Sequence, residues 1–187
     1  MSENKTGKSK STLKISLTAL FAAFIAGGTF IAIPIGPVPI TLQNFFVMLA
    51  GMILGPILCA ASVTLYLLAG IIGAPVFAGF TGGITRLAGP TGGFLIGYLC
   101  MALTAGLIAG NPLKKTITVR IITAAAAGLI VVYIPGLFWL KYSANLNWTK
   151  TLAAGLIPFI AGDILKGIAA VLIVPKLRKT AADYLYG

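Results

Sequence analysis

Charged residues are scarce in this chain of 187 residues, and their scarcity excludes an ordinary soluble domain. They make up 9% of the sequence, whereas soluble domains carry about 25%. Hydrophobic residues make up 58%, and residues 15–85 contain no charged side chain at all. A chain this short cannot bury that much apolar surface in a core of its own. The sequence therefore predicts a protein that is surrounded by lipid.

The residues used for metal binding and acid–base catalysis are also nearly absent. There is no histidine, and the only acids are Glu3, Asp163 and Asp183. Metal sites and paired-carboxylate chemistry need clusters of such side chains. We therefore expect no metal, no cofactor and no enzymatic activity. Cys59 and Cys100 lie in apolar stretches without zinc-site spacing, and we expect both to be buried hydrophobic residues.

The formal net charge is +11, from 14 Lys and Arg against three acids. A basic balance can indicate nucleic-acid binding. Here, however, the basic residues gather at the two ends and in short gaps between apolar runs. This distribution is typical of anchors at a membrane surface, so we expect a lipid bilayer as the partner and no nucleic acid.

Prolines and glycines divide the apolar sequence into six predicted membrane helices of about 20 residues each. The first three predicted spans end at residues 33–40, 54–56 and 70–75, and the others cover about residues 91–110, 116–134 and 158–174. The connections on one side of this arrangement are long. The fold class expected is an all-α integral membrane protein, a compact bundle of six transmembrane helices with long outer connections.

The positions of lysine and arginine predict how these helices are oriented. With six spans, ten of the 14 basic residues fall on one side, which the positive-inside rule identifies as the cytoplasm. We therefore expect a multi-pass cell-membrane protein with both termini cytoplasmic. Its parts would be a basic N-terminal segment (residues 1–14), a membrane domain with an extracellular pocket (15–175) and a C-terminal tail (176–187). A cleaved signal peptide is the alternative for the first span, but its apolar run exceeds the usual 7–15 residues or so.

Asp163 and Lys166 lie inside the last predicted span, three residues apart, and so share one face of the helix. Each would cost about 2.5–3.5 kcal/mol at the centre of a bilayer. Both are therefore expected to face the interior of the bundle. They could form a polar pocket close to the outer end of the helix. The alternative is a mutually neutralising pair that fixes helix packing.

A second cation, Arg86, lies in the glycine-rich stretch GGITRLAGPTGG between two apolar runs. Its guanidinium is a forked donor suited to a carboxylate, and glycine allows the backbone to approach a ligand closely. The alternative is a solvated loop charge or a contact with a lipid headgroup. Further candidates for the wall of the pocket are Gln43, Asn44, Phe77 and Tyr98, for which helix capping or anchoring at the membrane interface is the alternative.

The first predicted span carries small residues at four-residue spacing. These are Ala19 with Ala23 and Ala22 with Ala26. Such a face permits close approach of another helix. The partner would be either another membrane subunit or a neighbouring helix of the same bundle.

Four stretches resemble the signatures of the BioY family, in the family's order, between residues 14 and 175: GPVPITLQN, GAPVFAGFTGG, GPTGGFLIGY and PFIAGDILKG. BioY is the biotin-specific substrate-binding (S) subunit of energy-coupling factor (ECF) transporters. The resemblance implies high-affinity capture of extracellular biotin. It also implies that uptake is powered by a transmembrane coupling (T) subunit and two cytosolic ATPase subunits.

The chemistry of biotin, the ligand that the resemblance implies, matches the candidate residues, because a carboxylate that leaves water needs compensating positive charge. We expect Arg86 and Lys166 to share the biotin carboxylate and Asp163 to accept a hydrogen bond from the ureido ring. A site of few polar groups in an apolar cavity is the expected form. The alternative function is a solo membrane transporter for another small carboxylate-bearing vitamin.

The predicted orientation can be tested with cysteines at positions 4 and 185, in a chain whose native cysteines are replaced by alanine. Both should resist a membrane-impermeant thiol reagent in intact cells, because both ends are expected in the cytoplasm. Lys150→Cys, expected on the outer side, is the control that should be labelled. Labelling at either terminal position would contradict the six-span arrangement.

Overall fold

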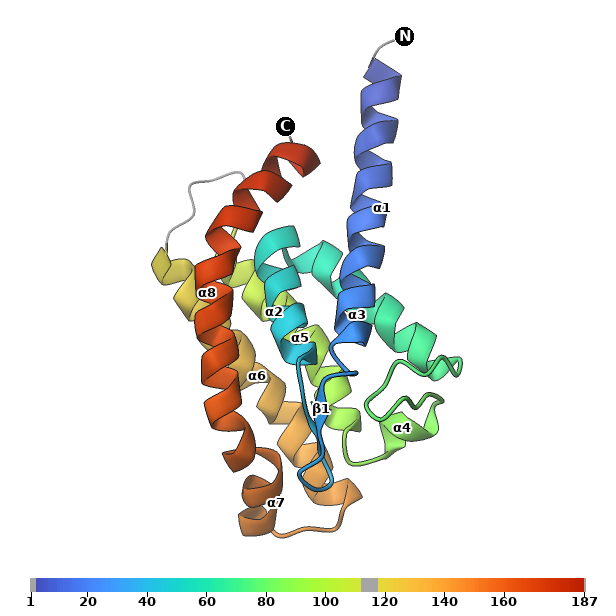
Figure 1. The fold of residues 1–187 in the computed structure, drawn as a ribbon, viewed down its shortest axis with the longest axis vertical. Coiled ribbons are helices and arrows are strands. Elements are labelled where there is room, and N and C mark those ends of the chain that lie inside the picture. The colour runs from blue at the N-terminus through green and yellow to red at the C-terminus, as the bar shows by residue number, and fades with distance from the viewer. Residues whose placement is uncertain (1–2, 112–117, 187) are drawn as a thin grey trace.

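The computed structural model describes residues 3–111 and 118–186. Six apolar helices form a bundle: α1 (Glu3–Gly27), α2 (Gln43–Leu54), α3 (Pro56–Ile71), α5 (Gly92–Ala109), α6 (Thr118–Ser143) and α8 (Ile157–Tyr186). The short helices α4 (Thr85–Ala88) and α7 (Trp148–Gly155) lie in connections, as does a hairpin of β1 (Ala32–Ile33) and β2 (Ile40–Thr41). The predicted all-α membrane fold is confirmed (Figure 1).

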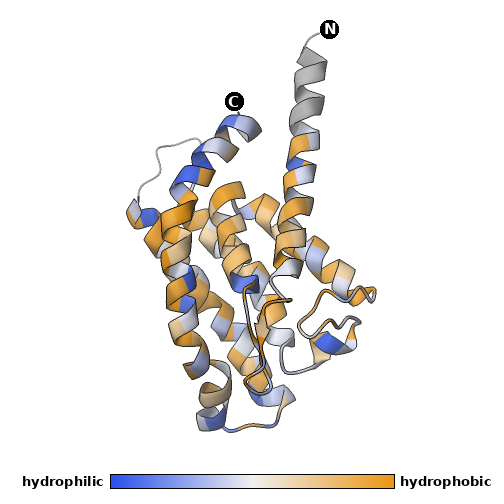
Figure 2. Cartoon of the chain, viewed as in Figure 1, coloured by the Kyte–Doolittle hydropathy of each residue, from blue (hydrophilic) through white to orange (hydrophobic). Residues whose placement is uncertain are grey.

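Three helical segments of the described chain are long and apolar enough to cross a membrane: residues 92–109, 118–143 and 148–184. The other apolar helices are shorter and cover residues 11–27, 43–54 and 56–71. In Figure 2, hydrophobic residues cover most of the helices, hydrophilic residues gather toward the ends, and one further hydrophilic patch lies midway along α8. The count of six spans stays a prediction.

Both termini lie at one end of the bundle, and the hairpin, α4 and α7 lie toward the other (Figure 1). The hairpin pairs Ala32 with Thr41 and Ile33 with Ile40, and the proline-rich segment forms its tip. The last of the connections at this end contains α7. The long connections thus share the end opposite the termini, where a site was expected.

Three predicted helix ends are wrong. The first predicted span was to end at residues 33–40, but α1 ends at Gly27 and residues 28–30 form turns that lead into the hairpin. The fifth predicted span was to stop at residue 134, but α6 continues through Pro135 to Ser143. Proline is tolerated inside membrane helices, and α5 packs against α6 at this point, where a Cβ atom at Gly97 would lie 3.2 Å from Cγ of Pro135. The last span was to stop at residue 174, but α8 continues through Pro175 to Tyr186. Apolar contacts of α8 with its neighbours outweigh the local cost of proline.

The predicted burial of the two cysteines is half right. Cys59 is buried and its thiol donates to the carbonyl of Val47. Cys100 is exposed on α5, because an apolar side chain on a helix in lipid can face outward as readily as inward. Apolar sequence alone does not distinguish these two positions.

The extension of α8 beyond Pro175 is held to the bundle by Arg178. This side chain is 1% exposed, and its Nη2 donates to the carbonyl oxygen of Gly110 at 2.5 Å. Gly110 directly follows the last residue of α5, where unpaired carbonyls attract a positive charge. The tail therefore packs back onto the end of the helix at the centre of the fold.

Helix α5 is the central element, with contacts to α2, α3, α4 and α6. Close approach depends on glycine at one crossing in particular. A Cβ atom at Gly106 would lie 2.5 Å from the nitrogen of Pro56 at the turn between α2 and α3. Only a residue without a side chain fits there, so α5 passes directly under that turn.

Candidate functional site

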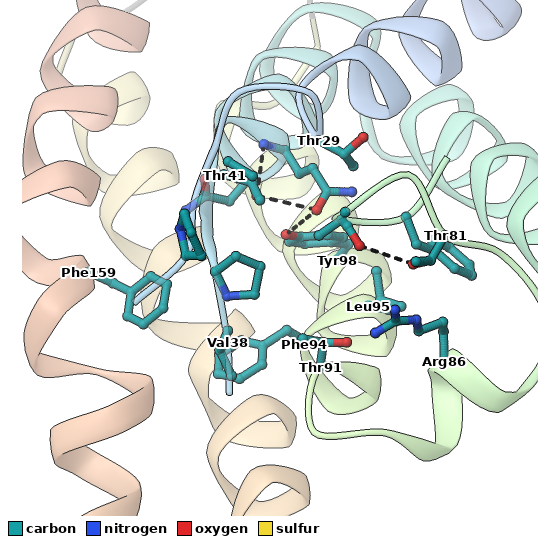
Figure 3. A pocket seen from close by; sticks show the side chains of 18 of the residues that line it. Thr29, Val38, Thr41, Thr81, Arg86, Thr91, Phe94, Leu95, Tyr98 and Phe159 are labelled. Atoms are coloured by element: carbon teal, nitrogen blue, oxygen red, sulfur yellow. Dashed lines mark hydrogen bonds between the residues drawn. The ribbon is translucent and has the colours of Figure 1, made fainter. Parts of the chain in front are cut away.

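A cavity of about 510 Å³ lies among the first turn of α2, the first half of α5, the middle of α6, α8 and the connections at the end opposite the termini. Small-molecule sites occupy about 300–1,000 Å³, so the volume suits a vitamin-sized ligand. Figure 3 shows its lining side chains converging from the hairpin, α5, α8 and the region of α4. Polar residues gather in three places on its wall.

The first polar place is built around Asp163 and Lys166 of α8, which form an ion pair of 3.0 Å between Nζ and Oδ1. They are 4% and 8% exposed. Asn44 completes a triangle, since Nζ of Lys166 donates to its Oδ1 at 2.9 Å and its Nδ2 donates to Oδ1 of Asp163 at 2.7 Å. The hydroxyl of Tyr133 donates to the other carboxylate oxygen.

These contacts place Asp163 behind the wall of the cavity. Asn44, Tyr133 and Lys166 line the cavity, whereas Asp163 does not. Both carboxylate oxygens already accept from protein donors. An ammonium group has three donors, of which Lys166 uses two here. The arrangement presents a cation, an amide and a phenol to a ligand, and Asp163 fixes all three.

The second polar place is built around Gln43, the first residue of α2, which is 3% exposed. Its Nε2 donates to the hydroxyl of Tyr66 at 2.5 Å. Its Oε1 accepts from the hydroxyls of Thr41 at 3.3 Å and Tyr98 at 3.5 Å. The carboxamide is therefore held by side chains from β2, α3 and α5.

The third polar place is Arg86 on α4, at the exposed mouth of the cavity. Figure 3 shows its guanidinium extending toward Leu95 and Phe94 of α5. Arg86 forms no ion pair with a described residue, so no carboxylate there balances its charge. A long charged side chain at this position can follow an anionic ligand group.

Aromatic rings make up much of the remaining wall. Phe77 is 2% exposed and meets the ring of Tyr66 edge-on, with centroids 5.6 Å apart. At the mouth, Phe30 and Phe80 stack with centroids 4.9 Å apart. Phe80 has φ of 57°, a left-handed conformation that is costly for a bulky residue. The connection after α1 and the connection after α3 thus meet over the cavity.

Comparison with known proteins identifies the family. The family model described as "BioY family" matches residues 2–183. The chain belongs to the BioY family. Among curated BioY proteins, the probable biotin transporter BioY of Pyrococcus horikoshii is 44% identical over 88% of this chain and 96% of that protein. The biotin transporter BioY of Thermotoga maritima is 40% identical over 88% and 95%.

A solved structure of this family has the same fold. It is a crystal structure of the S-component for biotin from an ECF-type ABC transporter. It matches with a TM-score of 0.81 and 35% identity over 90% of this chain and 92% of the solved one. The resemblance stated from the sequence motifs is therefore confirmed.

Six of the seven predicted ligand-binding residues line the cavity of this BioY protein: Gln43, Asn44, Phe77, Arg86, Tyr98 and Lys166. The seventh, Asp163, lies directly behind them. Sequence reasoning missed Tyr133, Phe94 and Phe159, which also line the cavity. The one available signal for Tyr133 was a tyrosine two residues before a proline in an apolar span. Phe94 and Phe159 are ordinary apolar residues in sequence, and only the packing brings them to the site.

The alanines of α1 do not share one environment. Ala19 and Ala23 are exposed, whereas Ala22 is buried and Ala26 half-buried. The predicted small-residue face therefore divides into an outward pair and a pair that packs within the bundle.

The dependence of Asp163 on its cation can be measured by unfolding in detergent. Lys166→Met should lower stability by about 3 kcal/mol, because it leaves a buried carboxylate without its cation. Adding Asp163→Asn should restore much of the loss, since the uncompensated charge is then gone. A double variant no more stable than Lys166→Met would contradict this account.

Proposed function

We propose that this chain is the biotin-binding S component of an ECF-type importer. It captures biotin on the extracellular side and works with a transmembrane T subunit and two cytosolic ATPase subunits. Both termini are then cytoplasmic, and the cavity opens to the outside at the opposite end of the bundle. The observation that carries the proposal is a cavity of about 510 Å³ in a chain of the BioY family. The buried polar end of this cavity is neutral overall, and its mouth bears a cation that has no ion-pair partner in the part of the chain that the structure describes.

The distribution of charge suggests how biotin is oriented. At the buried end, Asp163 and Lys166 neutralise each other. A carboxylate placed there would meet the negative charge of Asp163, whereas an uncharged ureido ring would find an amide, a phenol and an ammonium group. Arg86 offers net positive charge at the exposed mouth. We therefore assign the biotin carboxylate to Arg86.

This assignment refines the expectations drawn from sequence. Lys166 was expected to share the carboxylate and Asp163 to contact the ureido ring. With both oxygens of Asp163 already accepting from protein, we propose that it acts by holding Asn44 and Lys166 against the ligand. Losing one partner of such a buried charged contact costs about 2–5 kcal/mol, so Lys166 is expected to matter for affinity as well as stability.

The apolar parts of biotin match the rest of the wall. Its thiophane ring and the methylene chain need surfaces without polar groups. Phe77, Phe94, Leu95 and Phe159 provide such surfaces between the buried end and the mouth. An apolar cavity with a few convergent polar groups is the usual form of a small-molecule site.

Calorimetric titration of the purified chain with biotin and with its carboxamide derivative tests the function and the orientation together. Biotin should bind at micromolar concentration or below. Arg86→Ala should weaken biotin binding about tenfold, since a charge-assisted contact is lost at a partly solvated position. The same variant should bind the carboxamide about as well as the parent does.

Lys150→Ala is the matched control, because it removes an exposed cation from α7. It should change neither affinity. No heat with biotin for the parent would overturn the proposed function. Equal weakening of biotin and its carboxamide by Arg86→Ala would overturn the assignment of the carboxylate.

We propose further that the face of α1 bearing Ala19 and Ala23 docks the T subunit. Both are exposed, and small residues at this spacing let a neighbouring helix approach closely. Ala22 and Ala26 support this face from the inside. Ala22 is 6% exposed and belongs to the apolar core.

Replacing Ala19 and Ala23 with leucine should abolish energised biotin uptake in cells that contain the whole transporter, because a bulky face cannot be approached. Biotin binding by the isolated chain should survive. Ala22→Leu is the contrasting variant, which should lower the stability of the isolated chain through overpacking. Parallel loss of uptake and binding in the Ala19 and Ala23 variant would show that this face is structural.

A further inference from the structure

We propose that Tyr66, which does not line the cavity, is a positioning residue: its hydroxyl fixes the carboxamide of Gln43 so that an N–H donor faces the ligand. The inference rests on the proposed biotin-binding function. Tyr66 lies on α3 and is 2% exposed. Its hydroxyl accepts from Nε2 of Gln43 at 2.5 Å, and Gln43 is the residue that lines the cavity.

The orientation of the Gln43 carboxamide follows from its other neighbours. The backbone N–H of Gln43 donates to Oγ1 of Thr41 at 3.4 Å. The hydroxyl of Thr41 donates its own proton to the Gln43 carboxamide, with 3.3 Å between Oγ1 and Oε1. The carboxamide atom that faces Thr41 must therefore be an acceptor. The oxygen of the carboxamide must therefore face Thr41, and the nitrogen must face Tyr66.

The remaining hydrogen-bonding capacity of Gln43 decides what it can recognise. Its Oε1 accepts from two hydroxyls, those of Thr41 and Tyr98, which matches the two lone pairs of a carbonyl oxygen. Its Nε2 has two hydrogens, of which Tyr66 takes one. What Gln43 can still offer a ligand is one N–H donor. The matching ligand group is an acceptor without charge, such as the oxygen of a ureido carbonyl.

Tyr66 also supports the wall of the cavity by packing. Its ring meets that of Phe77 edge-on at 5.6 Å. Phe77 in turn lies over Gly70, where a side chain would collide with its ring. The ring and the hydroxyl of Tyr66 thus have separate effects. Phenylalanine at this position retains the ring and removes the hydrogen bond alone.

Calorimetric titration of Tyr66→Phe with biotin tests the role of the hydroxyl. Affinity should fall about 3- to 10-fold, the effect of one hydrogen bond, with little change in melting temperature. Tyr142→Phe is the matched control, since Tyr142 is 75% exposed, and it should bind as the parent does. Unchanged affinity of Tyr66→Phe would overturn the inference, while a parent that does not bind biotin would instead overturn the proposed function.

Two further measurements separate positioning from packing. A biotin analogue with sulfur in place of the ureido oxygen is a poorer acceptor, so the parent should prefer biotin and Tyr66→Phe should show less of this preference. In the background of Gln43→Leu, Tyr66→Phe should have no further effect on affinity. The proposal would be overturned if Tyr66→Phe preferred biotin over the sulfur analogue as strongly as the parent does. It would also be overturned if Tyr66→Phe weakened binding as much in the Gln43→Leu background as in the parent. Either result would show that Tyr66 acts through packing.

Discussion

The structure depends on burying one ion pair on α8, a long and otherwise largely apolar helix of a membrane protein. Asp163 and Lys166 cannot face hydrocarbon, so α8 must turn this face toward its neighbours. Their remaining hydrogen-bonding capacity then draws in Asn44 from α2 and Tyr133 from α6. Three helices that are distant in sequence are thereby tied at one point. The same point forms the buried end of the cavity.

The first turn of α2 joins this network to a second one. Gln43 and Asn44 are consecutive, and consecutive residues on a helix point about 100° apart. Asn44 therefore reaches α8, while Gln43 reaches Tyr66 on α3 and Tyr98 on α5. The two amides present different chemistry: Asn44 stands beside a buried ion pair, and Gln43 stands among neutral hydroxyls. A ligand that reaches both amides meets hydrogen-bond donors on α2 whose positions are fixed by α3, α5 and α8.

Central α5 explains why these groups can stay in place. It packs against α2, α3 and α6, and its close contact at Gly106 leaves little room for adjustment. The connections at the end opposite the termini are different, since the stacked Phe30 and Phe80 join two loops over the cavity. The helices thus supply the buried polar end of the cavity, and the connections supply part of its wall and its mouth, as is common for binding sites. The proposed entry of biotin uses the loop end, and the proposed T-subunit contact uses α1.

Composition and patterning determined the membrane class, the approximate helices and most candidate residues, because lipid leaves few places for a charge or a polar amide. Asp163, Lys166 and Arg86 could be selected for that reason alone. The helix ends at Pro135 and Pro175 could not, because packing outweighs the local preference of proline. Nor could the sequence show that Asp163 lies behind the cavity wall, that Ala19 is exposed while Ala22 is buried, or that Tyr66 and Tyr133 complete the polar networks. These features depend on which faces of separate helices meet, and only the tertiary structure decides that.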